Sequence, residues 1–174
     1  KRIDQYEDNA RLREKQAMLL LETGDDDQCV EVLEKLLADG HRSDEALLIL
    51  VGVQMKNERY EPALAVVDKY LQGGPSQQAT QIKSALLSKL GRHDESIALL
   101  QEIRQARPRD VANILNLAVA YHEAKKFDEA LALTQELLDM GKATEEVYLV
   151  RGKCQLDQKL YNEAKESFEL ALKA

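Results

Sequence analysis

Residues 125–140 read KKFDEALALTQELLDM, and this stretch decides the fold of the chain. Its apolar side chains recur every three or four residues, at Phe127, Ala130, Leu133 and Leu137. That spacing places them on one face of a helix, because an α-helix turns once in about 3.6 residues. We therefore expect an amphipathic helix that begins after a tight connection and buries one face.

The same pattern recurs along the chain at a fixed interval. Residues 159–174, KLYNEAKESFELALKA, place Tyr161 where Phe127 stood and Ala164 where Ala130 stood. A small side chain fills the equivalent position in five segments, with spacings of 34, 33, 34 and 34 residues, at Cys29, Ala63, Ser96, Ala130 and Ala164. A constant period of this length is typical of a helical repeat array.

The period predicts an all-α, right-handed α-solenoid of about five helical hairpins joined by short connections. We assign the solenoid to residues 10–174, with repeats at about 10–43, 44–76, 77–110, 111–144 and 145–174. Residues 1–9 are expected to extend the first helix, with Ile3 and Tyr6 continuing its apolar face. Glycines and N-capping residues such as Ser43 and Ser76 mark the connections between helices.

Composition limits the classes of partner. The formal net charge is −7, from 31 acidic and 24 basic residues, and it disfavours nucleic acid and anionic membrane surfaces. No apolar run approaches the length of a membrane span, so we expect no membrane insertion. Cys29 and Cys154 lie too far apart for a disulfide within one solenoid, which favours a reducing compartment and a cytoplasmic location.

The repeats resemble those of the tetratricopeptide repeat family. In the fourth repeat, the first-helix positions that carry the family pattern are Ile114, Leu117, Ala118 and Tyr121. In the second helix an aromatic residue precedes the small one by three positions, in the pairs Tyr60/Ala63, Phe127/Ala130 and Tyr161/Ala164. The resemblance covers roughly residues 10–174 and implies a protein-binding solenoid. Asp26 and His93 depart from the pattern, because each stands in the aromatic position.

We find no arrangement of residues that predicts catalysis. The three histidines and two cysteines do not have the spacing of metal ligands, and no phosphate-binding loop or nucleophile motif is present. The acidic run Asp25-Asp26-Asp27 lacks the glycine and glutamate of a calcium loop, so helix capping is the better interpretation. We expect a non-enzymatic protein without a cofactor or metal.

The resemblance implies that partners bind the concave face, which the family lines with its first helices. The groove residues carried over by register that we select as candidates are Leu48, Met55, Gln81, Leu115, Asn116, Val119, His122, Leu149 and Leu156. The alternative is that the neighbouring hairpin buries several of them. One known mode of the family grips a peptide's terminal carboxylate; here only Asn116 fits that pattern, and Glu146 would repel the carboxylate.

Two functions follow from the sequence. The first is a scaffold or adaptor whose concave face binds a peptide or amphipathic helix with apolar anchors and a basic flank. The second is a structural subunit that works through the ends of the solenoid, by self-association at the C-terminal end or by docking to a further domain. In that case Leu170, Ala171 and part of Phe168 are expected to be poorly covered. The identity of the partner is not encoded in any motif.

Overall fold

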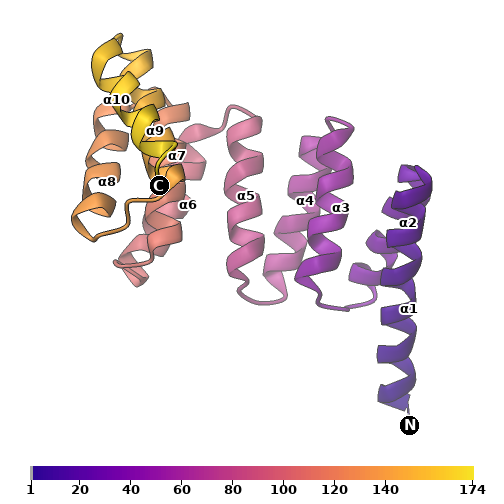
Figure 1. The fold of residues 1–174 in the computed structure, drawn as a ribbon. Coiled ribbons are helices and arrows are strands. Elements are labelled where there is room, and N and C mark those ends of the chain that lie inside the picture. Colours follow the sequence, from indigo (N-terminus) through magenta and orange to yellow (C-terminus); the bar gives the residue numbers. More distant parts are fainter. Residues whose placement is uncertain (1) are drawn as a thin grey trace. The chain divides into compact units, whose positions relative to one another are not determined.

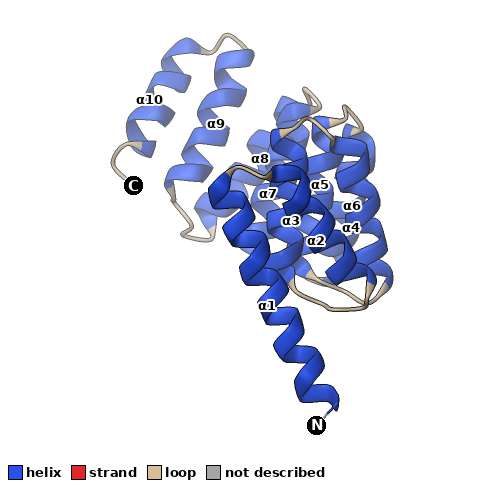
Figure 2. Ribbon diagram, turned by 90° about the vertical axis from the view of Figure 1, so that its right-hand side faces the viewer, coloured by secondary structure: helices blue, strands red, loops and turns tan. Residues whose placement is uncertain are grey.

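The computed structural model describes residues 2–174, and the side chains from residue 9 onward. Lys1 therefore lies outside the described residues, as do the side chains of Ile3 and Tyr6, which the sequence assigned to the apolar face. Within the described range every regular element is an α-helix, as Figure 2 shows. The predicted all-α fold class is confirmed.

Ten helices follow one another in the described part of the chain, joined by short turns (Figure 1). They are α1 (Arg2–Thr23), α2 (Asp26–Ala38), α3 (Asp44–Lys56), α4 (Tyr60–Gln72), α5 (Gln77–Lys89), α6 (His93–Ala106), α7 (Val111–Glu123), α8 (Phe127–Asp139), α9 (Glu145–Asp157) and α10 (Tyr161–Ala171). The chain divides into two compact units, residues 1–86 and 87–174, with the division inside α5. The exact borders of the repeats remain a prediction.

Side-chain caps set where several first helices begin. Ser43 and Ser76 accept hydrogen bonds from the backbone N–H of Ala46 and Ala79, each at 3.1 Å. Asp110 does the same for the N–H of Asn113, also at 3.1 Å. Each cap satisfies a backbone N–H donor that the first turn of a helix leaves unpaired. The start of each of these helices is therefore set by a residue next to it in the sequence.

The small residues that define the period are all buried. Cys29, Ala63, Ser96 and Ala130 have no exposed surface, and Ala164 has almost none. A short side chain at this point lets two helices pack closely, and a longer one would have to displace a neighbouring helix. Burial at all five positions supports the register that the sequence indicated.

The turn inside each hairpin uses a left-handed residue at one repeated position. Gly24 and Gly91 occupy it with φ of +81° and +72°. The same position holds non-glycine residues elsewhere, with φ of +56° at Glu58, +58° at Lys125 and +64° at Lys159. Left-handed backbone costs a side-chain-bearing residue about 1 kcal/mol relative to glycine, so three of the five turns carry local strain.

Each unit has its own apolar core. In the first unit, the buried cluster joins α1, α2 and α3 through residues such as Ala17, Leu33, Leu36 and Leu50. In the second, one cluster pairs Ile97 and Leu100 of α6 with α7. Two further clusters pack α7 and α8 against α9. These cores hold the first helices α3, α7 and α9 in place and so fix the residues on their outer faces.

The two polar residues in the aromatic position leave buried atoms unpaired. Asp26 accepts hydrogen bonds through Oδ2 from Lys56 Nζ at 2.8 Å and Asn57 Nδ2 at 3.3 Å. Its Oδ1 is buried with no partner among the described residues, and the same is true of His93 Nδ1. Asp25 caps α2 by accepting from Gln28 N at 3.3 Å, so the acidic run serves the helix start.

The last hairpin is better covered than the sequence suggested. Ala171 is buried, and the Phe168 ring packs against Gly152, where an added Cβ would lie only 2.7 Å from ring carbon Cε1. Only Leu170 of the three residues expected to be poorly covered is exposed, at 37%. The prediction was wrong for Ala171, because that residue lies on the face of α10 that packs inward. Phe168 is half-buried, so part of its ring stays accessible although Gly152 receives the rest.

Candidate functional site

The candidate residues of the first unit lie on α3 and α5. Leu48 is exposed over 49% of its surface, while Met55 and Gln81 are half-buried. Leu48 and Gln81 line the same hollow, which has a volume of about 530 Å³ and also includes Gln78 and Ile82. The structure therefore brings two predicted residues together, beside Gln78, which the register also places on the groove face, and Ile82, which it does not.

This hollow can receive an apolar group between polar edges. Leu48 and Ile82 provide aliphatic surface, and the Gln78 and Gln81 amides have no hydrogen-bond partner among the described residues. An amide offers two donors and one acceptor oxygen, so it can bind peptide backbone groups without requiring a particular side chain. The arrangement is suited to a peptide segment.

The candidate residues of the second unit lie on α7 and α9. Leu115 and Val119 are half-buried because they pack against the cluster formed by Ala118, Ala130, Val150 and Cys154. Leu115 also contacts a second cluster around Ile114, Leu137 and Val147. The alternative that the neighbouring hairpin buries some of the candidates thus applies in part. These two side chains pack in the core and expose only their outer surfaces.

A hydrogen bond joins α7 to α9 at one end of this surface. His122 Nε2 lies 2.8 Å from Asp157 Oδ2, and the imidazole ring also contacts Phe127 at 5.8 Å between ring centres. Both interactions fix the imidazole in place. His122 therefore has a structural role that register alone did not indicate.

The remaining candidates present polar and apolar groups to the surface. Asn116 is half-buried and has no hydrogen-bond partner in the described part of the chain. On α9, Leu149 is half-buried and Leu156 is exposed over 46% of its surface. None of the nine predicted residues is fully buried.

The carboxylate-gripping mode fits the structure poorly. Glu146 is exposed, and hydrogen bonds from its own backbone N–H and from Thr144 hold the pKa of its carboxyl below the usual range. It therefore stays negatively charged at neutral pH, and a peptide's terminal carboxylate would be repelled. Val150, which occupies the other position of that mode on α9, is buried and cannot donate a hydrogen bond from its side chain.

No metal or membrane site emerges from the described residues. Among them, no three histidine, cysteine, aspartate or glutamate side chains gather as metal ligands would. None of the described helices combines the length and apolar character needed to cross a membrane. Cys29 and Cys154 are buried and unpaired, and burial raises the pKa of both thiols, that of Cys154 to about 11.

Residues 53–167 match the family described as "Psidin, N-terminal TPR repeats region". The chain belongs to this tetratricopeptide-repeat family. Its repeats are 34% identical over 85 residues to the TPR repeat-containing protein YpiA of Bacillus subtilis (strain 168). That match covers 48% of the chain but only 20% of YpiA, so the chain spans about a fifth of its relative.

Solved tetratricopeptide-repeat structures share the fold. A tetratricopeptide repeat protein from Parabacteroides merdae ATCC 43184 superposes with a TM-score of 0.74 at 24% identity, covering 94% of this chain and 64% of that one. MamA (41–end) from Desulfovibrio magneticus RS-1 gives a TM-score of 0.71 at 20% identity, covering 95% and 94%. At these identities the likeness establishes architecture, and the tetratricopeptide-repeat fold supports a protein–protein interaction scaffold in general.

Sequence reasoning missed one cavity altogether. It lies between α2 and α4, with a volume of about 590 Å³, and its lining includes Leu37, Val66 and Tyr70. The family places its binding residues on the first helix of each hairpin, whereas α2 and α4 are the second helices of their hairpins. Gly73, directly before Gly74-Pro75, was the one available signal, because two glycines before a proline exceed what a simple turn needs.

Proposed function

We propose that this chain is a non-catalytic interaction module that binds a peptide or amphipathic helix of a partner protein along its first helices. The observation that carries the proposal is the exposure of aliphatic residues there, led by Leu48 and Leu156. Exposed apolar side chains flanked by unpaired amides are typical of a peptide-binding surface. The helices beneath are held by buried cores, so the surface is formed before the partner arrives.

Each unit would contribute a different kind of contact. In the first unit, an apolar side chain of the partner enters the hollow beside Leu48, and Gln81 binds the partner's backbone. In the second, the outer surfaces of Leu115, Val119 and Leu149 supply a shallow apolar strip next to Asn116. The strip gives general affinity, while the hollow selects a side chain that fits.

The charges at the edges favour a partner with basic flanking residues. Glu45 on α3 and Glu146 on α9 are exposed, and Glu146 is held in its charged form. Together with the net charge of −7, they attract a positively charged segment during its approach. Such steering acts on the association rate and weakens as salt is added.

The test compares glutamate substitutions at three exposed leucines. Leu48→Glu and Leu156→Glu are expected to lower the recovery of partners in a quantitative pull-down from the source organism by at least about fivefold each. The matched control is Leu19→Glu on α1, which introduces the same charge at another exposed leucine. Circular dichroism verifies folding. Equal recovery with all three variants would remove this surface from the proposal.

A second function is favoured by a separate observation. Exposed large apolar side chains gather on the last hairpin, where Leu160, Tyr161, Leu170 and Leu172 all have substantial accessible surface. We propose, as the alternative, that this hairpin mediates self-association or docks to a further domain. Sedimentation velocity over a range of concentrations, with Tyr161→Glu as the disrupting variant, separates it from binding along the first helices. A monomer at every concentration would exclude self-association.

We also propose a cytoplasmic location, which rests on the two cysteines. Both are buried and unpaired, as a protein of a reducing compartment would have them. Fractionation with an antibody against the chain tests the location, and recovery in an oxidising compartment would contradict it.

A further inference from the structure

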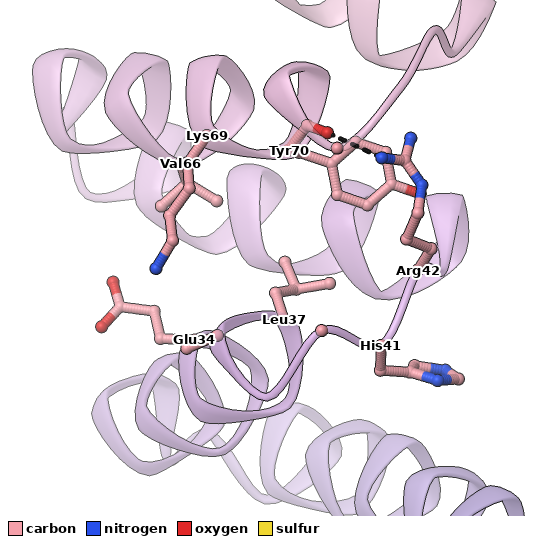
Figure 3. Close-up of a pocket in the computed structure, with 10 residues that line it drawn as sticks. Glu34, Leu37, His41, Arg42, Val66, Lys69 and Tyr70 are labelled. Carbon is pink, nitrogen blue, oxygen red and sulfur yellow. Dashed lines mark hydrogen bonds between the residues drawn. The ribbon is translucent and has the colours of Figure 1, made fainter.

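The cavity between α2 and α4 has the features of a second binding site. It has a volume of about 590 Å³ and opens between the C-terminal halves of the two helices, beside the connection that contains Gly40 and Arg42. Figure 3 shows its labelled lining residues. It is built from second helices of the first unit, so it is separate from the first-helix surface proposed above and does not depend on it.

Apolar side chains form the floor of this cavity. Leu37 of α2 and Val66 of α4 both pack against the core cluster of the first unit. They remain half-buried, so their outer surfaces are open to the cavity. Because the core holds them, the floor does not need to rearrange when a ligand arrives.

Arg42 is locked into one wall. Its Nη1 donates to the Tyr70 carbonyl oxygen at 3.0 Å and its Nη2 donates to the Gly74 carbonyl oxygen at 3.1 Å. The guanidinium also stacks on the Tyr70 ring, 4.4 Å from its centre. Gly73 makes this placement possible, because a Cβ at that position would collide with Arg42 Nη1.

The Tyr70 ring is held from its other end as well. Its hydroxyl donates to Asp44 Oδ1 at 2.8 Å, and Ser76 Oγ donates to the same oxygen at 2.9 Å. Burial and the Asp44 carboxylate together raise the pKa of Tyr70 to about 12, so the hydroxyl stays protonated and continues to donate. Tyr70 and Arg42 thus make a preformed wall, which lowers the entropy cost of binding.

Two cations stand on opposite sides of the apolar floor. Lys69 lies on one side with Glu34, and Arg42 lies on the other with Tyr70, as Figure 3 shows. Lys69 has no hydrogen-bond or ion-pair partner in the described part of the chain. Glu34, the one acidic side chain of the lining, already accepts a hydrogen bond from Gln54 Nε2 at 3.2 Å. The lining therefore carries a local positive excess on a chain of net charge −7.

We infer that this cavity binds an aromatic side chain of a partner protein that is flanked on both sides by acidic residues. The ring lies on Leu37 and Val66 beside Tyr70, and the flanking carboxylates pair with Lys69 and Arg42. An aromatic residue fits best because it buries more apolar area than an aliphatic one and leaves less of a 590 Å³ cavity to water. This charge preference is opposite to that of the first-helix surface, so the two sites select different segments.

The probe is an acetylated, amidated pentapeptide of sequence Glu-Asp-Trp-Glu-Glu. The chain contains no tryptophan, so the fluorescence of the probe reports binding without background. One control peptide replaces the tryptophan with alanine and is measured by its displacement of the fluorescent probe; the other replaces the four acidic residues with lysine and keeps the tryptophan. We expect the acidic tryptophan peptide to bind, and both controls to bind at least about tenfold more weakly.

Substitutions in the chain locate the bound probe. Ala38→Phe fills the cavity from its exposed edge, and Gly73→Ala displaces Arg42; each is expected to weaken binding by at least about tenfold. Lys69→Glu should weaken it about two- to fivefold at low salt, whereas Glu34→Gln should strengthen it about twofold. Lys89→Glu, at an exposed lysine outside the cavity, is the matched control for charge.

Each outcome decides the inference. Binding that is lost in Ala38→Phe and Gly73→Ala, weaker in Lys69→Glu and unchanged in Lys89→Glu supports it. Circular dichroism of each variant shows whether the helices are intact. The inference is overturned if the acidic peptide does not bind at about 1 mM. It is also overturned if the lysine peptide binds equally well, or if Ala38→Phe and Gly73→Ala both bind like the unaltered chain.

Discussion

Leu48 and Leu115 occupy the same position in two repeats, yet their surroundings differ. Leu48 in the first unit is half exposed over a hollow, whereas Leu115 in the second packs against two core clusters. The first helix of the following repeat contributes differently in the two places. On α9, Val147 and Val150 belong to the clusters that Leu115 contacts, whereas on α5 Gln78, Gln81 and Ile82 line the hollow beside Leu48.

The comparison shows that the position of a residue in the repeat does not decide whether its side chain is exposed to a partner or packs in the core. The space beside Leu48 is a candidate binding hollow, whereas the leucine at the same position in the second unit packs against the core. Predictions about binding therefore have to consider two adjacent repeats together.

The largest expected effect comes from placing a first-unit residue in the second unit. Gly152 of the second unit corresponds to Val51 of the first, and Phe168 corresponds to Val67. The first unit therefore pairs two valines where the second pairs a glycine with a phenylalanine. Gly152→Val would push into the Phe168 ring, which lies 2.7 Å from an added Cβ. We expect the free energy of unfolding to fall by about 1–3 kcal/mol.

The two buried cysteines show which unit is affected. Cys29 lies in the first unit and Cys154 in the second, and neither has exposed surface. In Gly152→Val, Cys154 should react faster with a thiol reagent under mild denaturant while Cys29 keeps its rate. Adding Phe168→Val should restore much of the protection. A uniform acceleration of both cysteines would contradict a loss of stability confined to the second unit.

The second prediction tests the comparison at its own two residues. Leu115→Ala should lower the free energy of unfolding by about 1–2 kcal/mol, because the side chain packs against two clusters. Leu48→Ala should change it by less than about 0.5 kcal/mol. Urea denaturation followed by circular dichroism measures both. Equal losses at the two positions would mean that the hollow beside Leu48 is not open in solution.

The third prediction concerns a feature that the units share. Glu58 in the first unit and Lys125 in the second hold the left-handed position of their turns without being glycine. Glu58→Gly and Lys125→Gly should each raise the free energy of unfolding by about 0.5–1 kcal/mol, since glycine adopts this backbone without strain. Thermal melts of the two variants check this. A loss of stability in either one would show that its turn is held by side-chain contacts instead.

The smallest effect is expected in the acid range. Lys56 lowers the pKa of Asp26 in the first unit, and Lys126 lowers that of Asp94 in the second. A carboxyl whose pKa is lower in the folded than in the unfolded chain stabilises the fold above the unfolded pKa, and this contribution is lost as the pH falls through the folded pKa. Asp26→Asn should therefore flatten the fall in melting temperature below about pH 4.

Asp94→Asn provides the comparison with a more exposed ion pair. Its carboxylate is far more exposed than that of Asp26, so solvent screens the interaction with Lys126 and the change in slope should be smaller. Melts between neutral pH and about pH 3 measure both slopes. A larger change in Asp94→Asn than in Asp26→Asn would contradict the assignment of Asp26 as the better-shielded partner.

The sequence was sufficient for the fold because its signals are local. The buried small residues Ala63, Ala130 and Ala164 define the period, and caps such as Ser43 and Asp110 define the helix starts. Each of these acts within one hairpin or between two neighbours. A period repeated five times leaves one register that buries all of them.

The candidate site was less predictable, because it depends on contacts that the period does not contain. Register placed Leu48 and Leu156 among the groove residues but left open whether the neighbouring hairpin buries them, and it gave no sign that His122 bonds Asp157. Arg42 reaches the carbonyl of Tyr70 from 28 residues away, and only the missing Cβ of Gly73 allows it. Contacts of this kind depend on the size of one particular neighbour, so a repeat pattern cannot supply them.

Site-specific photo-crosslinking tests the central claim most directly. A benzophenone side chain replaces Leu48 or Leu156 on first helices and, as controls, the exposed Ala98 of α6 or Ala132 of α8 on second helices. Each chain is irradiated in the cell of origin, and adducts are identified by mass spectrometry. Binding along the first helices predicts one shared partner crosslinked from Leu48 and Leu156 and absent from both controls. Adducts that form equally from Ala98 and Ala132, or from those positions alone, would contradict it.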